Sequence, residues 1–214
     1  MDVESVITEA RDITKEESYD DDWMVKRINM GLQEIASLFC IPGLSTSATV
    51  SALTTGNIVA MPSDFLHSLF LATTETYPNG LSLAPSLKDL TANAYLYPDT
   101  GDVQRVAVEF KSLCYVPIPA DAAETITIYY YKNPDAITLV SDLPAWIPAH
   151  LQKPLVLSYL CKEIFTLVEE GIDGQVPNTT KHINLYGQGL MMLQQFYPKA
   201  SKPKYAVTST PVWF

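Results

Sequence analysis

Two groups of amphipathic helical segments, separated by a long stretch of β-like sequence, constrain this chain more than any other feature. The clearest segment lies between residues 20 and 39, where apolar side chains recur at steps of 4, 4, 3 and 4 and so share one face of a helix: Met24, Ile28, Leu32, Ile35 and Phe39. Asp20–Asp22 can cap its N-terminus, and Ile41-Pro42-Gly43 ends it. A shorter amphipathic helix is predicted before it, with its apolar side formed by Val3, Val6, Ile7, Ala10 and Ile13.

Helical periodicity returns after Pro148 and continues to Gly171, with a kink expected at Pro154. Its apolar positions are Leu157, Leu160, Cys161, Ile164, Leu167 and Val168. A last helix is predicted from about residue 178 to residue 197, capped by Asn178-Thr179-Thr180 and stopped by Pro198. Its predicted stripe is Ile183, Tyr186, Leu190, Leu193 and Tyr197, with Gly187 and Gly189 allowing close approach to a neighbour.

Between these helical groups the sequence changes to short β-branched and aromatic runs. The predicted strands are Ala48–Leu53, Ile58–Met61, Leu66–Thr73, Val103–Phe110 and Thr125–Tyr131. Turn residues lie between them at positions 55–57, 78–80 and 99–102. A short helix over residues 86–95, capped by Ser86, is expected inside this region.

The order of segments predicts an α+β protein. Residues 1–44 and 134–197 are expected to form one antiparallel helical bundle, because both helical groups need apolar partners. Residues 45–133 are then an inserted antiparallel β region. Residues 198–214, which contain Pro203 and Pro211, are expected to form an extended C-terminal arm.

Composition favours a protein that is partly covered by other chains. Charged residues make up 18% of the sequence, against about 25% in average proteins. The formal net charge is −10, and residues 1–22 hold nine acids against two bases. The three cysteines are far apart and fit a reducing compartment. The start lacks a secretory signal pattern, and no run approaches the about 18 apolar residues of a membrane span. An oligomer without a membrane segment is therefore expected.

The sequence lacks the common catalytic and cofactor-binding motifs. The sequence contains no HExxH, CxxC, GxxxxGK[ST], GxGxxG or GxSxG motif. His67, His150 and His182 have no second ligand at metal-binding spacing, and Glu169 and Glu170 point in different directions on a helix. The sequence therefore predicts no catalytic residue, no cofactor and no metal site, and a protein that is not an enzyme. Tyr129, Tyr130 and Tyr131 are better explained by a half-buried strand than by a base-stacking surface.

Several segments in order resemble the head-to-tail adaptor, or tail-tubular-like, proteins of short-tailed bacteriophages. They are Trp23–Ala36 followed by Ile41–Leu44, Met61–Leu66 at a strand entry, Tyr131–Pro134, Asp142–Pro144 with Ile147-Pro148, and the long helix through Ile164-Phe165 to Glu169-Glu170-Gly171. The resemblance covers about residues 20–195, and the order of the segments carries it.

The resemblance implies a structural virion protein at the head–tail junction, assembled in the host cytoplasm. Such adaptors form a ring, commonly of twelve subunits, that docks under the portal protein, meets a downstream tail or nozzle protein and continues the channel for double-stranded DNA. The DNA would pass without sequence-specific binding. Alternatives are another tail, collar or head-completion subunit, or a carbohydrate-binding or hydrolytic β module.

The C-terminal arm is the candidate partner-binding segment. It combines three bases with apolar and aromatic residues and has no acid: Lys199, Lys202, Lys204, Tyr205, Val207, Val212, Trp213 and Phe214. A segment of this kind has too few apolar residues to fold alone, and its aromatic residues would be exposed on a monomer. We therefore expect it to pack on a neighbouring subunit or on the portal.

Overall fold

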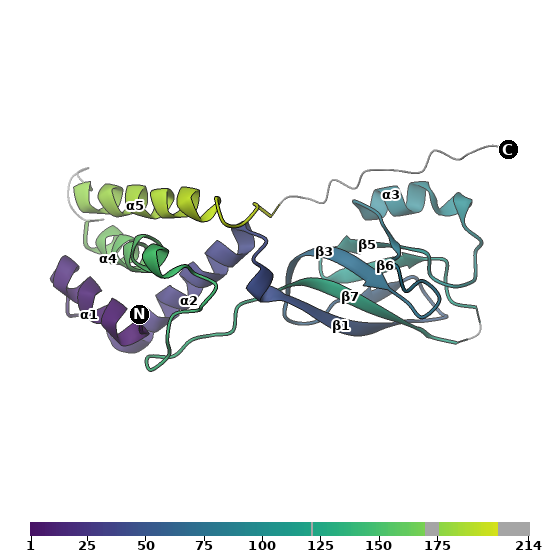
Figure 1. Cartoon of the computed structure of the whole chain (residues 1–214), viewed down its shortest axis with the longest axis horizontal. Helices are drawn as coiled ribbons and strands as arrows, with labels where there is room; N and C mark the ends of the chain where they lie inside the picture. Colours follow the sequence, from purple (N-terminus) through teal and green to yellow (C-terminus); the bar gives the residue numbers. More distant parts are fainter. Residues whose placement is uncertain (121, 170–175, 201–214) are drawn as a thin grey trace. The chain divides into compact units, whose positions relative to one another are not determined.

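The computed structural model describes residues 1–120, 122–169 and 176–200 (Figure 1). The chain divides into two compact units. The first, called the helical unit, contains residues 1–43 and 133–199, and the second, called the β unit, contains residues 44–132. The protein is thus of mixed α+β class, and the helical unit is assembled from both sides of the β unit in the sequence.

The helical unit is built around α4 (Ser158–Glu169), which packs against α1 (Val3–Thr14), α2 (Asp21–Leu38) and α5 (Pro177–Leu193). The predicted stripe on α2 is confirmed, because all five of its residues are buried. Asp2 and Asp20 cap α1 and α2 by accepting hydrogen bonds of 2.7 Å from the Ser5 N–H and 2.8 Å from the Trp23 N–H. The apolar faces of α1 and α2 therefore meet a common partner.

The approach to α4 is irregular around Pro154. A 3₁₀ turn at Ala149–Leu151 leads into a π-helical segment at Lys153–Leu157 before α4 begins. Proline has no N–H to donate within a helix, and wide π turns accommodate such a gap. The predicted local distortion is present, and its form is a π-helical segment.

The buried face of α5 differs from the predicted one. The buried residues are Thr179, His182, Tyr186, Gly189 and Leu193, whereas Ile183 is exposed. The stripe is rotated because two polar residues, Thr179 and His182, face the unit's interior, where Thr179 bonds Glu169 and His182 stacks on Phe165. The helix ends at Leu193, four residues before the predicted end.

The two glycines of α5 provide a matched test of packing. A Cβ at Gly189 would lie 3.0 Å from Leu155 Cδ2 and 3.2 Å from the Pro154 carbonyl carbon, whereas a Cβ at Gly187 would meet no atom of the described residues within 4 Å. We expect Gly189→Ala to lower the free energy of unfolding by about 1–3 kcal/mol through overpacking. Gly187→Ala should raise it by about 0.5–1 kcal/mol through helix propensity. Chemical denaturation of both variants tests this, and equal shifts would contradict it.

The β unit is a sandwich of two sheets (Figure 1). The first has the strand order β1-β7-β3, formed by Ser45–Ala52, Glu124–Lys132 and Phe65–Thr73. The second has the order β2-β6-β5-β4, formed by Ile58–Ala60, Ser112–Val116, Arg105–Glu109 and Ser82–Leu83. Ile126, Ile128 and Tyr130 of the first sheet share one core with Val106, Leu113 and Tyr115 of the second.

The predicted β region is mostly but not wholly antiparallel, because β4 pairs with β5 in parallel. The helix α3 (Leu87–Ala92) begins after Ser86, whose side chain caps it, as predicted. Leu90 of α3 packs on Ala107 and Cys114, so the helix covers part of the outer face of the second sheet. Strands β4 and β6 were not predicted from the sequence.

Candidate functional site

The start of the C-terminal arm lies against the end of α2. The Pro198 carbonyl accepts a hydrogen bond of 2.9 Å from the Cys40 N–H, and Lys199 forms an antiparallel bridge with Phe39. The Lys199 side chain is exposed. The other predicted arm residues lie outside the described residues: Lys202, Lys204, Tyr205, Val207, Val212, Trp213 and Phe214.

Two buried titratable groups of the helical unit, His182 and Cys161, have structural roles. His182 is buried and stacked on Phe165, and burial lowers its pKa below the ordinary value. Burial raises the pKa of the Cys161 thiol to about 12, so it is protonated at neutral pH and a poor nucleophile.

Among the described residues, no group of three His, Cys, Asp or Glu side chains could hold a metal ion. Within the same residues, no helix combines the length and apolarity that crossing a membrane requires.

Glu169 joins the end of α4 to the start of α5. Its carboxylate accepts hydrogen bonds from the Asn178 N–H at 3.2 Å and side-chain amide at 2.9 Å, and from the Thr179 N–H at 3.0 Å and hydroxyl at 2.8 Å. The predicted cap of α5 by Asn178 is therefore wrong, because the capping oxygens come from the preceding helix. Burial alone would raise the pKa of Glu169, but these hydrogen bonds outweigh it and hold the pKa below its ordinary value.

This carboxylate should make stability depend on acid pH. Since the folded pKa lies below the unfolded value of 4.5, the stabilisation is complete above about pH 4.5 and is lost as pH falls through the folded pKa. We expect Glu169→Gln to lower the melting temperature by several degrees at pH 7. The loss should shrink as pH falls below about 4. Glu75→Gln, at an exposed loop position, is the control. A Glu169→Gln protein that melts at the wild-type temperature would show that the Glu169 carboxylate does not stabilise the helical unit.

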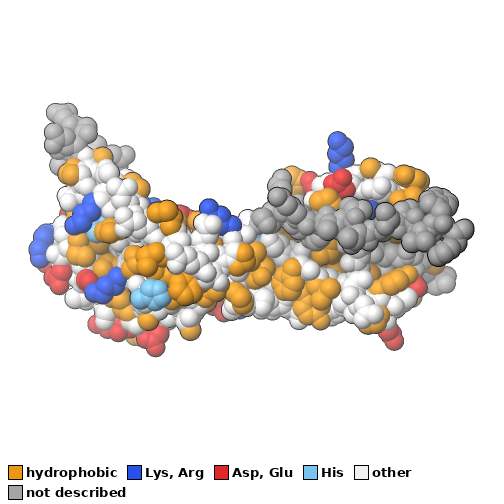
Figure 2. Space-filling model, turned by 45° about the horizontal axis from the view of Figure 1, so that its top comes forward, with side chains coloured by type: hydrophobic (Ala, Val, Ile, Leu, Met, Phe, Trp, Pro, Cys, Tyr) orange, Lys and Arg blue, Asp and Glu red, His pale blue; other side chains and the backbone are white. Residues whose placement is uncertain are grey.

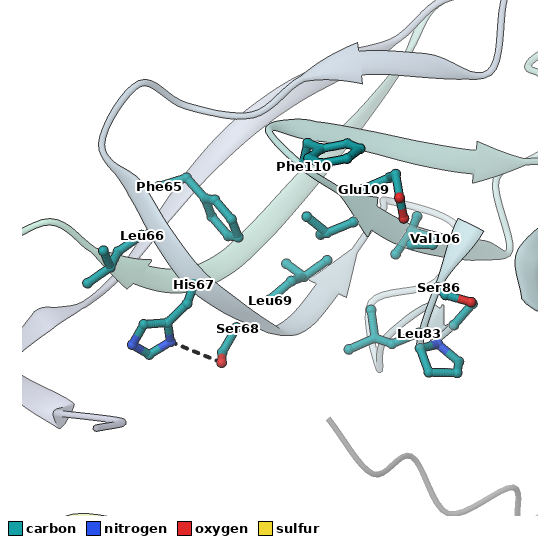
Figure 3. A pocket seen from close by; sticks show the side chains of 14 residues that line it. Phe65, Leu66, His67, Ser68, Leu69, Leu83, Ser86, Val106, Glu109 and Phe110 are labelled. Atoms are coloured by element: carbon teal, nitrogen blue, oxygen red, sulfur yellow. Dashed lines mark hydrogen bonds between the residues drawn. The ribbon is translucent and has the colours of Figure 1, made fainter. Parts of the chain in front are cut away.

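An apolar recess of about 400 Å³ opens in the β unit beside β3 and β5 (Figure 3). Its apolar lining includes Phe65, Leu66, Leu69, Leu83, Val106 and Val108. His67 Nδ1 lies 3.0 Å from Ser68 Oγ, and in Figure 3 this pair points away from Glu109. Ser68 lies within the register shift of β3 between His67 and Leu71, so its bond to His67 belongs to a local irregularity of the strand.

Phe110 at the rim of this recess is in an unusual conformation for an aromatic residue. It occupies the two-residue turn between β5 and β6 with φ 53° and is 91% exposed. Ser68, on the same recess, also has φ 53°. A left-handed conformation costs a non-glycine residue about 1–2 kcal/mol, and residues held in it cluster at functional sites. The recess rim is therefore a candidate contact surface, which the sequence motifs did not indicate.

The outer face of the first sheet is uncharged along β1 and β7. Ser47, Thr49 and Ser51 of β1 are exposed and lie opposite Tyr129, Thr127 and Thr125 of β7. Phe70 of β3 packs against Tyr129 and Tyr131, with ring centroids 6.4 and 5.3 Å apart. Tyr130 points inward and donates a hydrogen bond of 2.6 Å to Asp64 Oδ1. The prediction of a half-buried strand at the three tyrosines is confirmed.

The helical unit has a second apolar face on α5. Ile183, Gly187 and Met191 recur at steps of four along the helix, and Ile183 and Met191 are 48% and 64% exposed. Met192 and Phe196 are also exposed nearby, and Phe196 packs against His150. In Figure 2, where this side of the unit is turned forward, hydrophobic side chains gather on the surface. Exposed apolar clusters of this kind commonly mark protein contacts.

Comparison with known proteins identifies the family of the chain. Residues 1–204 match the family model described as SU10 adaptor protein, a match that spans both units. A search of curated proteins found no match. The adaptor part of the sequence resemblance is thereby confirmed, and the protein has the structural role of a bacteriophage adaptor. The chain belongs to the SU10 adaptor protein family.

Proposed function

We propose that this adaptor forms a closed ring of about twelve copies under the portal protein of a short-tailed phage. The ring joins the capsid to the tail, binds a downstream tail or nozzle protein and continues the DNA channel at the head–tail junction. The protein has no catalytic step in this role and needs no cofactor.

Exposed apolar surface on both units is the observation that carries this proposal. Burial of Met191 and Ile183 on α5, and of Phe110 on the β unit, would lower the free energy of the assembly by removing apolar surface from water. The low proportion of charged residues, 18%, agrees with a surface that is largely covered in an assembly. In a closed ring every copy buries two such faces, because one surface contacts the preceding copy and a different surface contacts the next.

The parts of the chain have separate tasks in this proposal. The helices of residues 1–44 and 134–197 supply the body of the ring, and the β region of residues 45–133 contacts neighbours. The arm, residues 198–214, packs on a partner protein. Its lysines, Lys199, Lys202 and Lys204, then meet acidic surface on the partner, since the segment has no acid of its own.

The net negative charge of the chain suits a channel for double-stranded DNA. A lumen lined with many bases would hold phosphates and release counterions, so that each contact would raise affinity and slow passage. A net charge of −10 per subunit opposes such binding. DNA therefore passes without sequence-specific recognition.

Co-purification tests the proposed place in the virion. The chain is mixed separately with portal protein, with the tail protein that follows it and with a collar protein of the same phage, and each mixture is separated by size. We expect a complex with portal and with the downstream tail protein. Binding to collar alone would support the runner-up, another tail or collar subunit, and would contradict the portal adaptor.

The aromatic face around Phe70, Tyr129 and Tyr131 keeps a carbohydrate-binding module as the second candidate. Aromatic rings on a sheet face can stack on sugars as well as on protein. A glycan array with the whole chain, and with Tyr129→Ala as the matched variant, separates the two. Glycan binding that is lost in Tyr129→Ala would favour the carbohydrate role.

A further inference from the structure

Within the described part of the chain, strand β1 is an open sheet edge, and it lacks the features that normally prevent pairing with another chain. Proteins protect such edges by charges, proline, bulges or short strands. Thr46–Ser51 of β1 contain no charged residue, proline or glycine, and β1 pairs with β7 over eight residues without a register shift.

The other described sheet edges are protected. Strand β3, at the far side of the same sheet, is interrupted by register shifts on both sides of His67. The edges of the second sheet are β2, with three residues, and β4, with two. Among the described strands, β1 is thus the long, regular edge that can accept another strand.

The core beneath this edge is incompletely covered. Ala48 and Val50 pack against the sandwich core but are only partly buried. Their outward-facing neighbours Ser47, Thr49 and Ser51 are exposed hydroxyl residues. A strand added beside β1 would therefore need apolar side chains toward the core and small polar side chains toward solvent.

The arm of the chain contains a segment with this pattern. Residues 205–210, Tyr-Ala-Val-Thr-Ser-Thr, lie between Pro203 and Pro211 and consist mainly of residues that favour strands. With period two, Tyr205 and Val207 share one face with Ser209, and Thr208 and Thr210 share the other with Ala206. The six residues match the six-residue span of Thr46–Ser51.

We propose that residues 205–210 of one copy add as a strand to the β1 edge of a neighbouring copy. Tyr205 and Val207 then cover Ala48 and Val50, and Thr208 lies on the hydroxyl face with Ser47 and Thr49. Donor segment and acceptor edge are different surfaces of one chain, and a contact of this head-to-tail kind repeats from copy to copy until the ring closes. The inference rests on the proposed ring and names the contact that links its subunits.

Disulfide trapping tests the contact in the assembled protein. Thr208→Cys is combined with Ser47→Cys, Thr49→Cys or Ser51→Cys in turn, and the assembly is oxidised and separated under denaturing conditions. We expect one combination to give a ladder of covalently linked copies, because directly opposed residues bring their Cβ atoms close. Val207→Cys with the same partners is the matched control, since a shift of one residue reverses the face. The chain with Thr208→Cys alone controls for Cys40.

A proline substitution provides the second measurement. Thr208→Pro removes an N–H from the donor strand, whereas Thr208→Val keeps it. We expect Thr208→Pro to weaken self-assembly at least about tenfold, with Thr208→Val close to wild type. Normal rings with Thr208→Pro, together with no ladder from any of the Thr208→Cys pairs, would overturn the strand addition but not the proposed ring. A link formed within one copy would overturn the exchange between copies, whereas failure of the wild-type chain to assemble even with portal would contradict the proposed function itself.

Discussion

Leu160→Asp is expected to leave the chain unfolded or insoluble. Leu160 is 0% exposed in α4, the helix that α1, α2 and α5 all contact. A carboxylate there would be buried without a partner, at a cost of at least about 4 kcal/mol. Since small domains have about 5–15 kcal/mol of stability in total, this loss removes a large part of it.

The same helix offers a control for this substitution. Leu167 is 42% exposed, so Leu167→Asp places the same charge on α4 in contact with water. Circular dichroism and thermal melting of the two variants measure the effect of burial, because both replace a leucine by aspartate in the same helix. A Leu160→Asp protein that melts like wild type would show that the two helical groups do not share one core.

Deleting residues 201–214 is expected to abolish assembly with portal while the fold is retained. The deletion keeps Lys199 and Pro198, whose backbone contacts with Phe39 and Cys40 belong to the helical unit. Burying Trp213 and Phe214 on a partner would supply about 3–6 kcal/mol of transfer free energy before ordering costs. Their loss therefore corresponds to about a hundredfold or more in affinity.

Melting temperature and portal binding are measured together on the deleted chain. Lys202→Gln with Lys204→Gln separates charge from aromatic burial, and this variant should bind with a moderate loss that grows smaller in high salt. If the deleted chain joins portal with unchanged affinity, the arm is not the anchor.

The sequence predicted those elements whose signals are local. The α2 stripe and the Asp20 cap depend on residues within one helix, and both are present. The buried face of α5 could not be predicted in this way, because its buried polar residues contact side chains of α4. Thr179 bonds Glu169, and His182 stacks on Phe165. Contacts between distant segments decide such positions.

The missed hairpin has a similar cause. The turn between β5 and β6 places Phe110 at positive φ, where glycine or asparagine would normally mark a turn. The sequence therefore reads as one long strand from Val103 to Phe110, and the recess that the hairpin borders leaves no local signal. The arm was identified from its composition and charge, but its partner depends on surfaces of another molecule.

The mass of the chain with and without portal protein tests the central claim most directly. Twelve chains of 23.7 kDa amount to about 280 kDa, a size well separated from the monomer. The account predicts that native mass spectrometry finds a closed ring of this size added to portal. A chain that stays monomeric and ignores portal at all concentrations would contradict it.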